Sequence, residues 1–505
     1  MAKFGRSARR LRGEKPKAGL PIKHLILGAT ILVIVVYVSG FIAVVQRMDA
    51  NNPDLVPPPK VKKMVSDALQ HQTPPKEKVQ ISDITIGYAV TITGCGSDPI
   101  TEGAAVLKHA VHLVSSQGTK GGRYNYQMYA IYHPDGEACA LPLKDLGFTL
   151  LKRETPVAVK DIQGDFLREK IEKNGCCGEK ELVKLEAYTL IQHPIVVHLD
   201  LDVLILKPMD ALFDWMLVDP QQQLVNYDTT GIPIMWPKME VPPTPNAFFT
   251  RDCKSNVHES CKRHLENCPF LWHAKKEEDP YSQLLSLSLT HLYTFSLLDN
   301  MVDPTLTYKP VQGGFLVLRP DMAVYQEFVD IITKGDYRSE KGWGGVVGAF
   351  YGGMTFQGII PYYYDYLHPG RSVELSRCIY NQMADNPKDK PTIDDVTHGR
   401  CRTNQTECED CRERPFEDVV SSHFTLCQKP WLCLPQDSDR IQQRLCRKLH
   451  HEWYTVRSDL EKSWGRSGMG PGNWQADHFF GYCTRLGKAG YLQIAEPYGQ
   501  PAEYK

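Results

Sequence analysis

Residues 195–206 read IVVHLDLDVLIL, an apolar run that is interrupted by Asp200 and Asp202. The run predicts one buried strand. Ionised carboxylates are seldom placed in such a strand because their desolvation is costly. Two carboxylates at positions i and i+2 project from the same side of a strand, and a cation between them would relieve their repulsion. Oxygen ligands favour Mg²⁺ or Mn²⁺. The alternative is a pair of edge carboxylates that cap the following turn.

The segments before this run alternate between strand and helix patterns. The expected strands are 84–93, 124–132 and either 148–151 or 157–159, and the expected helices are 101–115, 141–147 and 179–190. Such alternation is typical of an α/β unit with a mainly parallel sheet. Sheets of this kind bind ligands at the carboxyl ends of their strands.

Composition excludes several classes of protein. Of the 505 residues, 42% are apolar and 23% are charged, as in an average soluble globular protein. A wholly disordered chain, a collagen and a polytopic membrane protein are therefore excluded. The 58 basic and 59 acidic residues nearly cancel, so charge does not suggest a nucleic-acid-binding protein. Residues 1–24 hold eight basic and one acidic residue, which leaves 50 basic against 58 acidic in the remainder.

The N-terminal region predicts a membrane anchor. Residues 25–45 carry no charge, and a helix of that length is about 32 Å long, enough to span a bilayer. A cleaved signal peptide is the alternative, although its apolar region usually has only about 7–15 residues. The basic tail, residues 1–24, should stay cytosolic. Everything after the span would then lie in the lumen of the secretory pathway, as in a single-pass type II membrane protein. The proline-rich residues 46–82 are expected to form a stem.

All fifteen cysteines follow the apolar run. In an oxidising lumen disulfides are the default, so Cys401, Cys408 and Cys411 are expected in disulfides, with a metal cluster as the alternative. An odd number of cysteines leaves at least one free or intermolecular. Asn404 begins the only Asn-x-Thr sequon and is a predicted glycosylation site.

Eight short segments between residues 90 and 431 carry a further pattern. They are 90–93 (VTIT), 184–190 (KLEAYTL), 196–202 (VVHLDLD), 204–213 (LILKPMDALF), 312–320 (QGGFLVLRP), 356–360 (FQGII), 379–381 (IYN) and 423–431 (HFTLCQKPW). In this order they resemble glycosyltransferase family 8, the glycogenin, galactinol synthase and galacturonosyltransferase type. The spacing of six between His423 and Lys429 is that of the family's H-x-x-G-x-x-K-P-W motif.

The resemblance implies an α/β fold of the GT-A type for residues 83–431. A long insertion at about 228–298 and a cysteine-bearing extension at 432–505 lie outside it. The resemblance also implies a hexosyltransferase that uses Mn²⁺ or Mg²⁺. Such an enzyme moves a sugar, with retention, from a nucleotide-diphosphate donor, usually UDP-linked. The acceptor would be a glycan, a protein or a small molecule. Combined with the anchor, the family implies a Golgi or ER membrane location with a luminal catalytic domain.

The resemblance also assigns roles to single residues. Asp200, Asp202 and His423 would be metal ligands. Lys429 would stabilise the departing diphosphate as a positive charge, and Gln357 would lie near the sugar ring. The donor-binding positions would be Thr91, Thr93, Lys184, Asp200, Gln312, Gly313, Gly314 and Gly358.

Structural interpretations of the same residues stay open. A lone histidine is more often structural than a ligand, and Lys184 and Lys429 could be ordinary solvated lysines. Thr91 and Thr93 are good strand formers, and Gln357 could anchor its loop by a hydrogen bond.

This sequence departs from the family at several positions. Gln312-Gly313 replaces Asn-Ser, Phe356 replaces an aspartate, Leu426 replaces a glycine, and Gly94 replaces an asparagine. These changes leave the donor sugar open. They also permit a catalytically inactive member that serves as a carbohydrate-binding or scaffold protein. A sugar nucleotidyltransferase is disfavoured because such enzymes are usually soluble and cytosolic.

Two aromatic segments have open roles. Residues 248–252 (FFTRD) would meet an acceptor or pack as a loop, and the tyrosines of 361–364 (PYYY) would stack on a sugar or belong to the core. Trp453, Trp464 and Trp474 in the extension are expected in a core.

Overall fold

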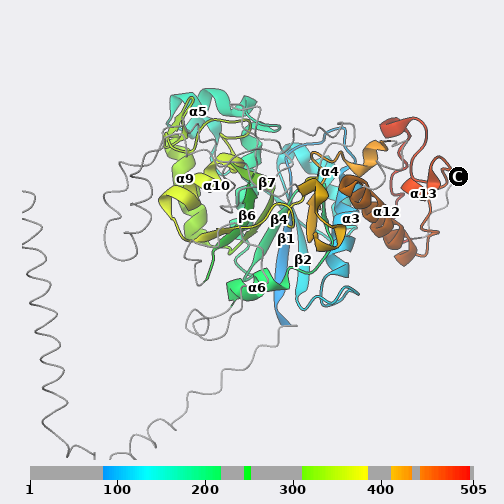
Figure 1. The fold of residues 1–505 in the computed structure, drawn as a ribbon. Coiled ribbons are helices and arrows are strands. Elements are labelled where there is room, and N and C mark those ends of the chain that lie inside the picture. Colours follow the sequence, from blue (N-terminus) through cyan, green and yellow to red (C-terminus); the bar gives the residue numbers. More distant parts are fainter. Residues whose placement is uncertain (1–82, 218–243, 252–309, 385–410, 435–443, 501–505) are drawn as a thin grey trace, which may run out of the picture. The chain divides into compact units, whose positions relative to one another are not determined.

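The largest sheet of the protein has seven strands: β1 Thr85–Ile92, β2 Asn125–Tyr132, β3 Thr149–Lys152, β4 Val196–Leu199, β6 Ala247–Arg251, β7 Val311–Leu318 and β10 Ser372–Glu374 (Figure 1). The computed structural model describes residues 83–217, 244–251, 310–384, 411–434 and 444–500. All of these residues belong to one unit, Val79–Lys505.

The strands lie in the order β10-β6-β7-β4-β1-β2-β3. β1 pairs in parallel with β2 and β4, β2 with β3, and β10 with β6. Only β7 runs against its neighbours in this sheet, since it is antiparallel to both β4 and β6. This mixed, mainly parallel sheet confirms the α/β class that a GT-A fold implies.

Helices cover both faces of the sheet. The α-helices of the described residues are α3 Ile100–Leu113, α4 Glu137–Ala140, α5 Asp165–Lys170, α6 Asp210–Leu217, α9 Met322–Lys334, α10 Phe356–Pro361, α12 Leu445–Ser463 and α13 Ala476–Phe479. The 3₁₀ helices are η2 Pro134–Gly136, η3 Leu141–Lys144, η4 Val159–Asp161, η5 Ile171–Lys173, η6 Gly178–Thr189, η12 Cys411–Glu413, η13 Phe416–Asp418, η14 Pro430–Leu432 and η15 Gly487–Gly490, and a π-helix, η10, spans Tyr362–Leu367.

Two apolar cores lie on opposite faces of the sheet. Tyr88 and Val90 of β1 belong to one core, and Ala89 between them belongs to the other, because successive side chains of a strand point to opposite faces. α3 and α12 pack on the first core, and η6, α9 and α10 pack on the second (Figure 1).

The apolar run at 195–206 is two strands, so the prediction of one continuous strand is wrong. β4 ends at Leu199, and a turn closed by Val203 N–H donating to the Asp200 carbonyl (3.2 Å) leads into β5, Val203–Ile205. β5 leaves the large sheet and pairs antiparallel with β11, Ser421–His423. The break has a physical cause: it removes two carboxylates from the interior of a sheet, where their desolvation would be costly.

Most other predicted elements are present. The strands at 84–93 and 124–132 and the helix at 101–115 are confirmed to within a few residues. The helix at 179–190 is confirmed in 3₁₀ form, and of the two candidates for the next strand the structure has Thr149–Lys152.

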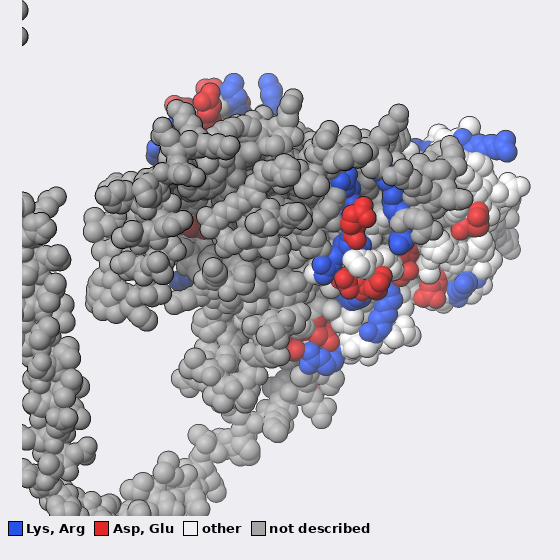
Figure 2. All heavy atoms as spheres, in the orientation of Figure 1, with Lys and Arg blue, Asp and Glu red and all other residues white. Residues whose placement is uncertain are grey.

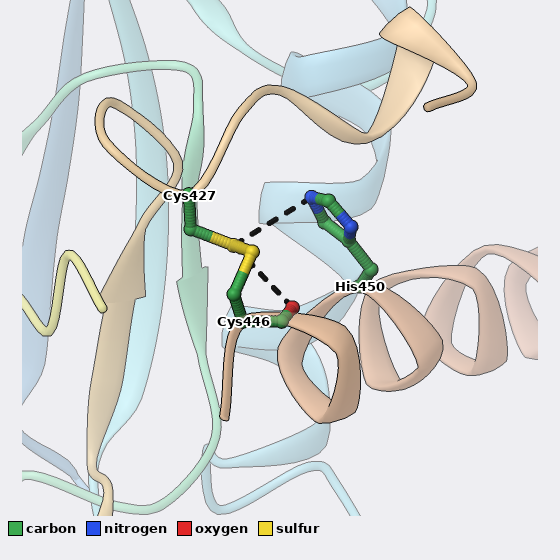
Figure 3. A group of neighbouring side chains, drawn as sticks. All are labelled: Cys427, Cys446 and His450. Atoms are coloured by element: carbon green, nitrogen blue, oxygen red, sulfur yellow. Dashed lines mark hydrogen bonds between the residues drawn. A yellow bond between two sulfur atoms is a disulfide. The ribbon is translucent and has the colours of Figure 1, made fainter. Parts of the chain in front are cut away.

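Four disulfides join the described cysteines: Cys95–Cys139, Cys378–Cys411, Cys427–Cys446 and Cys433–Cys483. The disulfide interpretation is therefore confirmed for Cys411, while Cys401 and Cys408 lie outside the described residues. Figure 3 shows that His450 of α12 points at the Cys427–Cys446 bond, and its Nε2 lies 2.7 Å from the Gln428 carbonyl. This group is not a metal site, because sulfurs bonded to each other are not thiolate ligands.

The C-terminal extension is joined to α3 through buried charges. Arg457 lies 3.3 Å from Glu102 and 3.9 Å from Glu461, and Arg466 lies 3.1 Å from Glu461. We call Glu102, Arg457, Glu461 and Arg466 the C-terminal ion cluster. On the face drawn in Figure 2, basic and acidic side chains of the described residues lie interspersed rather than separated.

The aromatic segments pack in the interior. Phe248 and Phe249 are buried in β6, and Tyr363 and Tyr364 are buried in the core beside α9 and α10. Trp453 is buried in the core of the extension, as expected, and Trp464 and Trp474 pack against that core.

Several predictions fall on residues that the structure does not describe: the tail, span and stem (1–82), most of the insertion, and Asn404. Within the described residues, no helix has the length and apolarity needed to cross a membrane.

Candidate functional site

The break after β4 places acidic side chains at an edge of the large sheet. Asp200 follows β4 directly, and its backbone N–H donates to the Gly314 carbonyl of β7 (3.1 Å). The pairing of β5 with β11 places His423 opposite Val203, beside Asp202. Three segments that are far apart in the sequence therefore meet at this point.

Asp200, Asp202 and His423 form what we call the Asp-Asp-His cluster. One ligand atom from each residue lies within 4.8 Å of the others. His423 Nε2 is 3.2 Å from Asp202 Oδ1 and 3.8 Å from Asp200 Oδ2. Asp202 and His423 are buried, whereas the side chain of Asp200 is 31% exposed. The cluster therefore has an open side.

The surroundings of the cluster fit a divalent cation. A Cβ atom at position 314 would lie 2.4 Å from His423 Cε1 and 3.0 Å from Asp200 Oδ2, so only glycine leaves the cluster its space. His423 Nδ1 is buried, and it has no hydrogen-bond partner among the described residues. Two carboxylates and one imidazole are a ligand set that Mn²⁺ and Mg²⁺ accept.

Lys184 is buried behind the cluster and is not a solvated surface lysine. Its Nζ donates to Asp200 Oδ1 (2.8 Å) and to the Gly313 carbonyl (3.2 Å), and it lies 3.8 Å from Glu181. Burial alone would lower the pKa of Lys184, but the charges of Asp200 and Glu181 outweigh burial and raise it. The ammonium group therefore stays charged.

Lys429 lies on the open side of the cluster. Its Nζ is 3.0 Å from Asp202 Oδ2 and 3.5 Å from Asp98, and it sits over the ring of Trp431. Burial would raise the pKa of Asp202, but the charges and hydrogen bonds of His423 and Lys429 hold it well below its usual range. Burial alone would lower the pKa of Lys429, but the charge and hydrogen bond of Asp202, together with the charge of Asp98, raise it.

The predicted donor-binding residues of β7 and α10 differ in whether they border the site or contact only the protein around it. The amide oxygen of Gln312 accepts from Gly314 N–H (2.6 Å) and from Asn381 Nδ2 (3.1 Å), so it anchors the strand. Gln357 lies against Gly313, where a Cβ would be 3.0 Å from its Cγ. Gly358 packs so closely on Gly353 that a Cβ would lie 1.9 Å from the Gly353 carbonyl oxygen. Gln357 therefore borders the site, and Gly358 sets the position of its loop.

Thr91 in β1 and Thr93, which directly follows β1, are both already engaged in hydrogen bonds. Thr91 Oγ1 is 2.8 Å from Nε2 of His198, a buried neighbour that the sequence reasoning passed over. Burial, with the charge of Lys184 acting in the same direction, lowers the pKa of His198 to about 3, so it is neutral. Thr93 hydrogen-bonds the thiol of Cys177.

Two further residues were missed. Glu181 lies three residues before Lys184, and this spacing places both side chains on one helix face. The contact of Glu181 with Lys184 could therefore have been predicted from the sequence. Asp98 stands in the loop before α3, and no sequence signal pointed to its contact with Lys429.

Neither a model of any known protein family nor any curated protein matches the sequence. Solved structures similar to the chain include mouse xyloside xylosyltransferase 1 without ligand (12% identity, 69% of this chain, 99% of that chain, TM-score 0.35). The galactosyltransferase LgtC in complex with donor and acceptor sugar analogues has 12% identity over 74% of this chain and 95% of that chain (TM-score 0.32). The glycosyltransferase GlyE of Streptococcus pneumoniae has 10% identity over 74% and 60% (TM-score 0.31). Similarity at this level carries no inference about function.

Proposed function

We propose that the protein is a metal-dependent, retaining glycosyltransferase of the family 8 type. It would take a sugar from a nucleotide-diphosphate donor, with UDP-sugars as the first candidates, and transfer it to a glycan, protein or small-molecule acceptor. The convergence of Asp200, Asp202 and His423, with a lysine on either side, is the observation that supports this function most directly.

In this proposal Asp200, Asp202 and His423 hold Mn²⁺ or Mg²⁺. When bound, such an ion neutralises charge on the diphosphate leaving group. Lys429 exchanges its contacts with Asp98 and Asp202 for the diphosphate and stabilises the charge that develops as the sugar departs. Lys184 stays behind the cluster and orients Asp200 through its 2.8 Å hydrogen bond.

The acceptor side of the proposal relies on fewer groups. Gln357 borders Gly313 and would contact the donor sugar. In a front-face route, a phosphate oxygen of the leaving group takes the proton of the acceptor hydroxyl. This route needs no side-chain carboxylate as the base.

Phe356 supports a second candidate function. Its side chain is fully buried, with its ring 5.8 Å from that of His198, so this position offers no polar group to a sugar. A catalytically inactive member that binds nucleotide sugars or glycans as a scaffold fits this observation. For either function we also propose a Golgi or ER membrane location, with residues 25–45 as the anchor.

A thermal-shift screen of the full-length chain with nucleotide sugars, in the presence and absence of Mn²⁺, tests these proposals. We expect stabilisation by one UDP-sugar only when Mn²⁺ is present, loss of that stabilisation in EDTA, and slow release of UDP. Metal-dependent binding without turnover on any acceptor would favour the scaffold. An absence of metal-dependent binding to every nucleotide would refute both functions.

A further inference from the structure

A tight turn carries two adjacent cysteines next to the site. Cys176 and Cys177 lie between η5 and η6, and Gly175 and Gly178 on either side of them have φ of +73° and +62°. These left-handed conformations favour glycine. The two sulfurs are 2.6 Å apart. Among the described cysteines, these two alone are outside disulfides, so both can react as thiols.

The geometry of the pair does not suit a metal ion, although Glu181 is close enough to complete a ligand set. Two sulfurs bound to one tetrahedral Zn²⁺ at about 2.3 Å would stand about 3.7 Å apart. The observed separation is nearer to the length of a sulfur–sulfur bond, about 2.05 Å. The pair is therefore arranged for a bond between its two sulfurs.

A chain of contacts runs from the pair to the Asp-Asp-His cluster. Cys176 Sγ donates to Glu181 Oε1 (3.1 Å), and the same oxygen lies 3.8 Å from Lys184 Nζ. Lys184 in turn donates to Asp200 Oδ1 at 2.8 Å. Glu181 and Lys184 are buried, so water screens their contact only weakly, whereas Cys176 at the outer end of the chain of contacts is exposed.

We propose that Cys176 and Cys177 are a dithiol site that a low-molecular-weight disulfide oxidises to a vicinal disulfide, and that this change alters how Glu181 and Asp200 share Lys184. The effect on the cluster rests on the proposed metal site, whereas the thiol chemistry does not.

The oxidation proceeds by two exchange steps. The Cys177 thiolate attacks one sulfur of the reagent, whose sulfur–sulfur bond breaks and releases one thiolate. Cys176 then attacks the Cys177 sulfur of this mixed disulfide and releases the second thiolate. The pair loses two electrons and two protons, and the reagent becomes two thiols. Cys177 is suited to the first attack: when the single S–H of Cys176 turns from Glu181 to Cys177, this hydrogen bond lowers the pKa of the Cys177 thiol to about 7 despite partial burial, and a thiolate is the nucleophile.

Oxidation should act on Lys184 through the lost S–H group. In the dithiol, Cys176 donates to Glu181 Oε1; a disulfide has no such donor. Glu181 would then bind Lys184 more strongly, and Asp200 Oδ1 would be freer to ligate a metal. We expect the disulfide form to bind Mn²⁺ about fivefold more tightly than the dithiol form.

The test equilibrates the full-length protein in glutathione buffers at several poises and then alkylates free thiols. Mass spectrometry follows the peptide that contains both cysteines. We expect an unalkylated peptide, lighter than the dithiol peptide by two hydrogens, at poises where the four disulfides of the described residues persist. In Cys176→Ser, a glutathione adduct on Cys177 should accumulate instead, because no second thiol resolves it. Full alkylation of both cysteines in the wild type at every poise would overturn the proposal.

Calorimetric Mn²⁺ titration of the dithiol and disulfide forms, after removal of glutathione, tests the proposed effect of oxidation on the Asp-Asp-His cluster. Glu181→Gln keeps the thiols but should abolish the difference in Mn²⁺ affinity. Equal Mn²⁺ affinity of both wild-type forms would overturn the coupling to Lys184. Absence of Mn²⁺ binding in both forms would refute the coupling and the metal site together, and peptide trapping would still judge the thiol chemistry by itself.

Discussion

The Asp-Asp-His cluster and the C-terminal ion cluster are both groups of charged side chains from distant parts of the chain, but they differ in access to water. In the C-terminal ion cluster the side chains of Arg457, Glu461 and Arg466 have no exposed surface, and each faces an opposite charge. At the other cluster, Asp200 and Lys429 keep about a third of their side-chain surface exposed. A closed set of charges holds two parts of a protein together, whereas an open set can exchange its internal partners for a ligand.

The largest effect should come from Asp202→Asn, which tests whether the open Asp-Asp-His cluster serves activity more than stability. We expect kcat/KM for glycosyl transfer to fall by about 10³-fold, because a metal ligand is lost. The free energy of unfolding should fall by about 1 to 2 kcal/mol, because buried Asp202 loses its ion pairs with His423 and Lys429 but Lys429 can turn to solvent. Steady-state kinetics and urea titration measure the two quantities. Asp459→Asn, an exposed carboxylate paired with His109, is the matched control, and comparable activity of both variants would exclude Asp202 as a ligand.

Arg457→Leu should have the opposite profile. It leaves Glu102 buried without its partner, and we expect a loss of about 3 to 5 kcal/mol in the free energy of unfolding, with normal kcat/KM for the molecules that remain folded. Denaturant titration measures the loss. Arg123→Leu breaks an exposed pair with Asp210 and should cost less than about 1 kcal/mol. Inactive but stable Arg457→Leu protein would contradict the division of roles.

The dependence of stability on pH tests the packing of the extension on the loop before Lys429, because His450 of the extension hydrogen-bonds the Gln428 carbonyl of that loop. Burial lowers the pKa of His450 from 6.5 to about 4, so between these values the unfolded chain binds the proton more strongly. Stability from neutral His450 is complete above pH 6.5 and is lost as the pH falls, by about 3 kcal/mol at pH 4. The groups facing the ring are the Gln428 carbonyl, Arg447 and Cys427. Urea titrations at pH 7 and pH 4 of wild type and His450→Gln measure the effect; an equal pH dependence in both would contradict it.

The smallest effect should come from Gln357→Ala, on the open cluster alone. We expect a drop of about tenfold in kcat, equal to about 1.4 kcal/mol, with the affinity for Mn²⁺ unchanged. The measurement is initial-rate kinetics together with metal titration. Gln326→Ala, on the exposed face of α9, is the control. Should Gln357→Ala weaken Mn²⁺ binding and spare kcat, the residue supports the metal site and does not contact the sugar.

Sequence reasoning located the two aspartates of the Asp-Asp-His cluster because Asp200-Leu201-Asp202 stands out within an apolar run. His423 was assigned only through the resemblance of residues 423–431 to the family motif. The break after Leu199 was not predicted, because apolar residues resume directly after Asp202 and the pairing of β5 with β11 depends on a distant segment of the chain. The C-terminal ion cluster was not predicted at all. Glu102 and Arg457 look like ordinary helix charges, and only the packing of α12 on α3 brings them together.

The disulfides Cys427–Cys446 and Cys433–Cys483 have a consequence for proteolysis. They flank Lys429 on both sides and tie its loop to the extension. A protease that cut the backbone between residues 434 and 444 would leave both fragments covalently joined. The nicked protein, heavier only by the one water that hydrolysis adds, would stay a single covalent species until a reductant was added, and Lys429 would keep its place beside Asp202. Gel mobility without reductant would therefore report an intact chain in a preparation whose backbone is already cut.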